Sequence, residues 1–186
     1  MKTNRPHAQH APSHPVRLAY VKQLPQATQA LLGEIHFGTS PALPDSTLAP
    51  AAWVGMPLLD GAAHIELWTS EQPVVAGRIG PLTFARNRDV LFGCFAADSP
   101  ADFATFEARI QEAYARLLTL IDSEGYPHLL RVWNYFPDIG DCQGDLDRYM
   151  VFCRGRYQAL EGHYGKLIHW LPAASAVGTR HGGIVI

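Results

Sequence analysis

A short segment near residue 150 carries three arginines and a tyrosine, and such side chains could bind a negatively charged ligand. The segment 148–156 reads RYMVFCRGR. A guanidinium group binds a carboxylate through two parallel hydrogen bonds, so the candidate binding residues are Arg148, Tyr149 and Arg156. On a helix, Tyr149 and Arg156 share one face, and Arg148 lies about 100° round from Tyr149. A carboxylate-binding helix is therefore one interpretation of the segment.

The same residues allow a structural interpretation. Arg148 could pair with Asp145 or Glu161 at the surface, since isolated helical arginines are usually solvated. Gly155 inside a helix costs about 1 kcal/mol relative to alanine, which a close approach by a ligand or by neighbouring backbone would explain. The sequence leaves both interpretations open.

Other chemically capable side chains favour structural roles. Cys153 has no paired histidine motif, and we expect it to pack in the core. Asn134 lies in a strand, where we expect it to hold the turn at 137–138, with contact to a pocket as the alternative. The scattered histidines lack the spacing of metal ligands, so no catalytic metal is expected. These histidines are His163, His169 and His181.

Composition restricts the class of protein. The 186 residues are 47% hydrophobic and 17% charged, with a net charge of -2, which is typical of one globular domain. Because the net charge is close to zero and slightly negative, we expect no nucleic-acid partner and no membrane partner. Three cysteines without a CxxC pair, and no apolar leader, indicate a cytoplasmic protein. Residues 1–15 are polar and proline-containing, and we expect a disordered tail there.

The rest of the chain, 16–186, predicts an α+β fold. Residues 38–57 hold four prolines and read as a long surface loop. From His64 onward, four short apolar runs separated by turn residues predict an antiparallel meander. These runs are HIELWTS, VVAGRI, LTFAR and VLFGCFA.

Two helices should cover one face of this sheet. Ser99 is the expected cap of the first, with Pro100 at its first position, and an apolar stripe at three- and four-residue spacing runs to about Ser123. The second is expected from about 146 to 160. Between them, HLLRVWNYF at 128–136 predicts a central buried strand.

The last residues, IVI, predict the start of a further strand. An unpaired apolar strand would leave an open hydrophobic edge. We therefore expect more sheet to follow, so that the chain is a domain truncated before a carboxyl-terminal domain.

The segment 128–159, HLLRVWNYFPDIGDCQGDLDRYMVFCRGRYQA, resembles the chorismatase (3-hydroxybenzoate synthase) family. It is similar to that family's strand LRxWNYFPDI, short polar loop and helix RYxxFxxGR. The similarity continues through LPAASAVGT at 171–179. Rare residues in fixed order over this length make the signal specific.

This resemblance implies a RidA/YjgF (chorismate mutase-like) fold, in which a twisted, mainly antiparallel sheet is covered on one face by two helices. It also implies cofactor-free cleavage of chorismate to pyruvate plus a 3- or 4-hydroxybenzoate or a dihydroxycyclohexadiene acid. The family's general acid is a glutamate of the carboxyl-terminal half, with no matching motif here. The implied partners are chorismate and, through self-association or pairing, the carboxyl-terminal half.

Two alternatives belong to other classes of protein. A RidA-like imine-hydrolysing or small-molecule-binding module would need an arginine on a late strand, and the nearest candidate, Arg180, is expected in a turn. A non-catalytic interaction domain is the second alternative.

Overall fold

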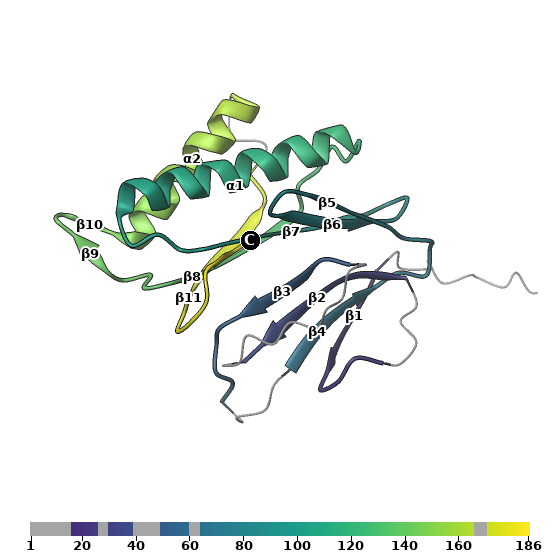
Figure 1. Cartoon of the computed structure of the whole chain (residues 1–186). Helices are drawn as coiled ribbons and strands as arrows, with labels where there is room; N and C mark the ends of the chain where they lie inside the picture. The colour runs from purple at the N-terminus through teal and green to yellow at the C-terminus, as the bar shows by residue number, and fades with distance from the viewer. Residues whose placement is uncertain (1–15, 26–29, 39–48, 60–63, 166–170) are drawn as a thin grey trace, which may run out of the picture.

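The computed structural model describes residues 16–25, 30–38, 49–59, 64–165 and 171–186. These residues form two main sheets, a small hairpin and two helices. The helices cover one face of a six-stranded sheet, and a four-stranded sheet packs against its other face (Figure 1). The α+β class is therefore confirmed, with two principal sheets where one was predicted. The expected tail at 1–15 lies outside the described residues.

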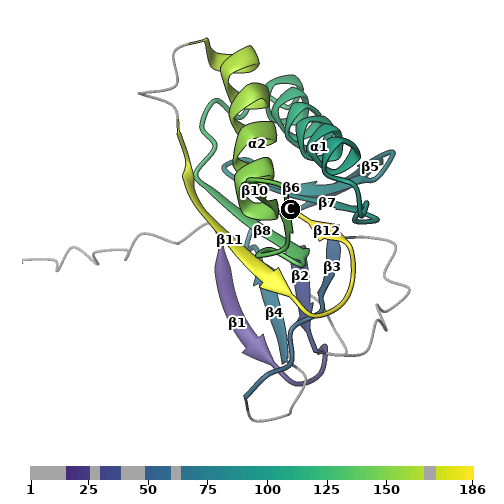
Figure 2. The same ribbon diagram turned by 90° about the vertical axis from the view of Figure 1, so that its left-hand side faces the viewer.

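The six-stranded sheet contains most of the predicted strands. Its order is β11 (Ala173–Thr179), β8 (Arg131–Pro137), β12 (Ile184–Val185), β7 (Leu91–Ala97), β6 (Leu82–Arg86) and β5 (Val75–Ile79). The strands β5, β6 and β7 form an antiparallel meander, as their alternating pattern predicted. β11 runs parallel to β8, because the intervening α2 (Arg148–Tyr164) returns the chain to the same end of the sheet. Figure 2 shows α2 above these two strands.

The four-stranded sheet has the order β1 (Arg17–Val21), β4 (His64–Thr69), β2 (Leu31–Phe37) and β3 (Ala51–Val54). Two expectations were wrong here. β4 pairs with β1 and β2 and takes no part in the meander. Within the predicted loop at 38–57, β3 forms a strand parallel to β2, and residues 39–48 lie outside the described part.

The first helix, α1 (Phe103–Ser123), starts later than its sequence suggested. Asp102 is its N-cap, and its carboxylate accepts a hydrogen bond of 2.8 Å from the amide of Thr105. The expected cap Ser99 instead accepts a hydrogen bond from Arg148. Asp147 caps α2 in the same way, and it is the last residue of the short hairpin of β9 (Cys142–Gln143) and β10 (Leu146–Asp147). Both helices are thus begun by aspartates.

An aromatic cluster joins the helices to the sheet. Phe136 of β8 lies with its ring centroid 5.3 Å from Phe106 of α1 and 5.0 Å from Phe152 of α2. On the other face of the sheet, Cys94 and Val185 pack with Val54 of the small sheet, and Tyr135 of β8 is partly buried against them. β8 is therefore buried on the face towards the helices and half-buried on the face towards the small sheet.

The last strand corrects another expectation. β12 does not form an open edge, because Val185 pairs with Ala96 of β7 on one side and with Tyr135 of β8 on the other. Ile186 exchanges backbone hydrogen bonds of 2.8 and 2.9 Å with Phe95. These residues occupy the middle of the six-stranded sheet (Figure 1).

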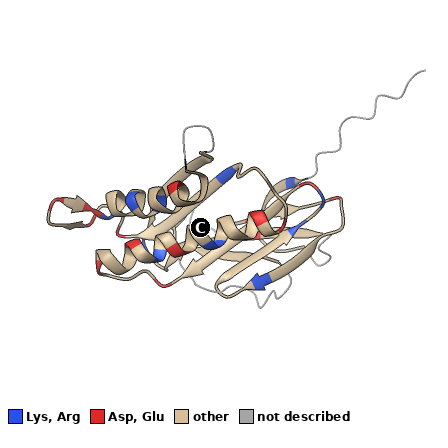
Figure 3. Cartoon of the chain, turned by 90° about the horizontal axis from the view of Figure 1, so that it is seen from above, with Lys and Arg blue, Asp and Glu red and all other residues tan. Residues whose placement is uncertain are grey.

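Charged residues are distributed over both helices and several loops, whereas the strands carry few of them (Figure 3). Acidic and basic positions alternate along α1, as in the surface pairs of Glu112 with Arg109 and Arg116. Neither described helix combines the length and apolarity needed to cross a bilayer.

Candidate functional site

Arg148, the first candidate residue, is 3% exposed and bound by protein acceptors. Its guanidinium donates hydrogen bonds of 2.7 Å to the hydroxyl of Ser99 and 2.5 Å to the carbonyl of Pro100, and a long one to Ala101. Its Cζ lies 4.0 Å from the ring centroid of Phe106. Burial lowers the pKa of this guanidinium. Arg148 thus fixes the segment that enters α1 and is buried away from the exposed face of α2.

Tyr149 and Arg156 lie on one face of α2, with Cys153 between them. Tyr149 is 47% exposed, and its ring stacks on Phe152 with centroids 6.2 Å apart. Hydrogen bonding to Cys153 raises the pKa of the Tyr149 hydroxyl, while the nearby Arg156 opposes this shift. The Arg156 guanidinium is half-buried, with Cζ 5.8 Å from the Tyr114 ring centroid. Its Nε is buried and has no hydrogen-bond partner among the described residues.

Gly155 marks a contact between the two helices. A Cβ placed on Gly155 would lie 2.9 Å from the carbonyl oxygen of Glu107 and 3.3 Å from Cβ of Ile110. The close approach expected at this glycine is therefore made by the backbone of α1.

Asn134 has a structural role, although with partners other than the predicted turn. Its Oδ1 accepts a hydrogen bond of 2.7 Å from the Tyr114 hydroxyl, and its Nδ2 donates one of 2.7 Å to the carbonyl of Ser175. Burial raises the pKa of Tyr114 to about 12, although the neighbouring Arg156 acts in the opposite direction. Arg156, Tyr114 and Asn134 therefore form one polar cluster, buried at Tyr114 and Asn134, that connects α2, α1, β8 and β11.

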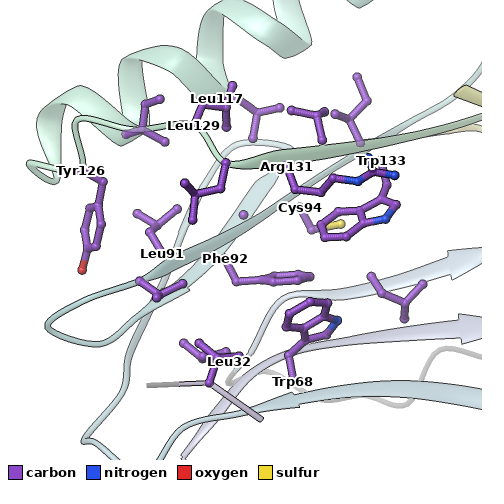
Figure 4. Close-up of a pocket in the computed structure, with 18 of the residues that line it drawn as sticks. Leu32, Trp68, Leu91, Phe92, Cys94, Leu117, Tyr126, Leu129, Arg131 and Trp133 are labelled. Carbon is purple, nitrogen blue, oxygen red and sulfur yellow. The ribbon is translucent and has the colours of Figure 1, made fainter. Parts of the chain in front are cut away.

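A cavity of about 390 Å³ lies between β7, β8, α1 and the small sheet. Figure 4 shows Leu91, Phe92 and Leu117 around it, with Trp68 on the small sheet and Trp133 on β8. The ring of Trp68 lies 5.6 Å from that of Phe92 and 5.8 Å from that of Trp133. The wall is thus mainly aromatic and aliphatic.

The few charged groups at this cavity are already engaged. Glu66 accepts a hydrogen bond of 2.7 Å from Trp68 and one of 3.2 Å from Tyr20. This carboxylate raises the pKa of the Tyr20 hydroxyl. Arg131 lies 5.4 Å from the Trp133 ring centroid and donates to the hydroxyl of Ser175. A cavity with one such cation beside carboxylates is poorly suited to a doubly negative ligand.

The other residues singled out in the sequence form no second site among the described residues. Cys153 is partly buried against the main core. Arg180 lies between β11 and β12, as expected, and its amide donates to the carbonyl of Gly55. Within the described ranges, no three His, Cys, Asp or Glu side chains are grouped as metal ligands. His169 lies outside those ranges.

Sequence reasoning missed one buried acid. Glu34 of β2 is 0% exposed, and His36 lies 3.6 Å from its carboxylate. Neither carboxylate oxygen has a hydrogen-bond partner among the described residues. The charged residue in LLGEIHF interrupts an apolar strand, and that interruption was the available signal.

Comparison with known proteins identifies the class to which this α+β fold belongs. The chain belongs to the chorismatase FkbO/Hyg5-like, N-terminal family, whose model matches residues 66–186. Among individual relatives, it is 34% identical over 164 residues to a chorismatase of Streptomyces hygroscopicus. It is also 31% identical over 120 residues to a 3-hydroxybenzoate synthase of the same organism.

A solved structure agrees with these relatives. The crystal structure of a chorismatase superposes with a TM-score of 0.74 at 31% sequence identity, covering 91% of this chain and 52% of that one. The match to the S. hygroscopicus chorismatase covers 86% of this chain and 46% of the relative. The chain thus spans about half the length of these relatives.

Proposed function

We propose that this chain forms the amino-terminal half of a chorismatase-type enzyme, one that releases pyruvate from chorismate. The observation that supports this most is the combined likeness to chorismatases, 34% identity over 164 residues and a TM-score of 0.74. A RidA/YjgF-type arrangement, a hydroxybenzoate or dihydroxycyclohexadiene product and a cytoplasmic location belong to the same proposal.

The reaction requires a proton donor and water. A general acid protonates the terminal methylene carbon of the enolpyruvyl ether, which leaves an oxocarbenium ion. Attack by water gives a hemiketal that breaks down to pyruvate and the dihydroxycyclohexadiene acid, and loss of one water from that acid would give the hydroxybenzoate. A carboxyl group kept neutral in a dry pocket suits the first step. We propose that this acid comes from polypeptide outside these 186 residues.

The part assigned to this chain is binding of a substrate carboxylate by the exposed face of α2. Arg156 offers a half-buried guanidinium, and Tyr149 is an exposed tyrosine seven positions earlier on the same helix. Hydrogen bonds to charged groups contribute about 1.5–3 kcal/mol. One carboxylate contact of this kind would change affinity by roughly 10- to 100-fold.

Calorimetric titration of the chain with chorismate tests this assignment. We expect binding, with a Kd raised at least about tenfold in Arg156→Ala. The matched control is Arg154→Ala on the same helix, because Arg154 is already paired with Glu107. Equal affinities for the two variants would remove Arg156 from the site.

Pyruvate release, followed with a coupled assay, tests the reaction itself. We expect little or no pyruvate from the chain alone and turnover by a polypeptide that includes the carboxyl-terminal half. Rapid release by the chain alone would contradict the location proposed for the general acid. Absence of turnover in both proteins would contradict the proposed function.

A further inference from the structure

The cavity described above lies inside the six-stranded sheet, in line with β12. Ile186 exchanges backbone hydrogen bonds with Phe95 of β7, so the ladder is still formed at this residue. Beyond that point β7 runs on to Leu91 and β8 to Arg131. Along these stretches, no strand among the described residues pairs with the edge of β7 that faces β8, or with the edge of β8 that faces β7. The two strands therefore flank the cavity from opposite sides.

The register defines what a longer β12 would meet. On β7, Ile184 lies opposite Ala97, Val185 opposite Ala96 and Ile186 opposite Phe95. Four residues added after Ile186 would therefore lie opposite residues 94, 93, 92 and 91 in turn. On β8, Val185 lies opposite Tyr135, so the first and third added residues would lie opposite Trp133 and Arg131. Every one of these residues, from both strands, lines the cavity.

Backbone groups on β7 point into the same space. In an antiparallel pair, alternate residues bond to the neighbour on each side. Phe95 bonds to Ile186, so Gly93 and Leu91 must also direct their N–H and C=O groups away from β6 and towards the cavity. Buried backbone groups of this kind need partners. A small apolar ligand could not supply them, whereas another strand would.

The side chains on both walls fit an apolar strand. Towards the small sheet, the first and third positions would face Phe92, Trp68 and Trp133 (Figure 4). Towards the helices, the second position would lie over Gly93, which has no side chain and whose Cβ would stand 3.4 Å from Leu117. A strand buried on both faces is apolar throughout.

We propose that the space between β7 and β8 is a slot for about four residues of extended, apolar polypeptide that lengthens β12. The occupant is polypeptide joined at the position of Ile186, because β12 already fills the first positions and runs into the slot. The matching family model is an N-terminal one and the relatives are about twice as long, so they have polypeptide to supply it. This inference does not rest on the proposed function.

Two extended variants of the chain test the slot. One carries Val-Ile-Val-Ile after Ile186, and its matched control carries Val-Pro-Val-Pro. The prolines remove the N–H groups at the second and fourth positions, which are those that would donate to Gly93 and Leu91. One kcal/mol shifts the Tm of a domain of this size by about 2–4 °C, so we expect a rise of about 5 °C or more for the first variant only.

Hydrogen exchange identifies where the added residues lie. The amides of Gly93 and Leu91 should exchange more slowly in the Val-Ile-Val-Ile variant than in the proline control. Equal Tm values for both variants, or unchanged exchange at these amides, would overturn the proposal.

Two further measurements distinguish other occupants. An equal Tm rise from a free Val-Ile-Val-Ile-Lys-Lys peptide would show a strand supplied by a separate molecule, and would overturn the covalent source. Slower exchange of the same amides in the unextended chain with 3-hydroxybenzoate would show a small-molecule cavity. We expect neither effect.

Discussion

The hydroxyl of Tyr114 on α1 donates a hydrogen bond of 2.7 Å to Oδ1 of Asn134 on β8. Both side chains are buried, and the Asn134 amide continues the connection to the carbonyl of Ser175 on β11. This chain of bonds joins a helix to the two parallel strands. An acceptor that is buried this deeply is costly to leave without a donor.

Tyr114→Phe should therefore lower the free energy of unfolding by about 1–2 kcal/mol, because Asn134 Oδ1 loses its donor while the ring packing stays. Urea denaturation at pH 7 measures the change. Tyr157→Phe is the control, since its hydroxyl donates to Glu161 at the surface, and it should change stability by less than about 0.5 kcal/mol. Similar losses in both variants would contradict the importance of the buried bond.

Alkaline pH should reduce the difference between the native chain and Tyr114→Phe. Burial raises the pKa of Tyr114 from 10.0 to about 12 in the folded protein. The unfolded chain therefore loses this proton first, and the native protein loses stability as pH rises from 10 towards 12. Cys94, whose pKa is also raised to about 12, is present in both proteins and cancels in the comparison. A difference that stays constant from pH 8 to 11.5 would contradict this expectation.

Arg148→Ala should destabilise the fold by about 2–4 kcal/mol, because the backbone carbonyls before α1 and the hydroxyl of Ser99 lose a buried donor. Lysine should not rescue the variant, since an ammonium group lacks the planar fork that reaches several acceptors. Thermal unfolding measures both effects. Arg154→Ala, which breaks the pair with Glu107, should cost less than about 1 kcal/mol. A loss of less than about 1 kcal/mol in Arg148→Ala would indicate that the hydrogen bonds of Arg148 do not stabilise the folded protein.

Gly155→Ala and Gly162→Ala should change stability in opposite directions. A Cβ at Gly155 meets the backbone of α1 at 2.9 Å, so this variant should lose about 1–3 kcal/mol. Gly162 is also in α2, but a Cβ there would have no neighbour within 4 Å among the described residues, and alanine should gain up to about 1 kcal/mol. Chemical denaturation of the two variants provides the comparison. Stabilisation of both would mean that the helices separate easily at Gly155.

Local patterns in the sequence predicted the parts of the fold that depend on near neighbours. Alternation from Val75 to Ala97 and the apolar spacing after Phe103 report which side of an element is buried, so the meander and α1 were predicted. The partition into two sheets was not, because the pairing of β4 with β1 and β2 depends on long-range contacts. β3 was missed because it is four residues long and lies in a proline-rich segment.

The candidate site was harder to predict than the fold. The sequence correctly grouped Tyr149 with Arg156, because helical spacing alone determines a shared face. It could not reveal that Arg148 binds the segment at 99–101, since a guanidinium suits a peptide carbonyl as well as a ligand carboxylate. Glu34 was overlooked for a similar reason, because burial depends on how the sheets pack.

The central place of residues 184–186 has a consequence for biosynthesis. Polypeptide leaves the ribosome from its amino terminus, so β7 and β8 are made well before the residues that lie between them. Until residues 184–186 emerge, these two strands expose unpaired edges, and such intermediates are prone to aggregate. Folding during translation should therefore show a late, slow step, with chaperone demand greatest just before it.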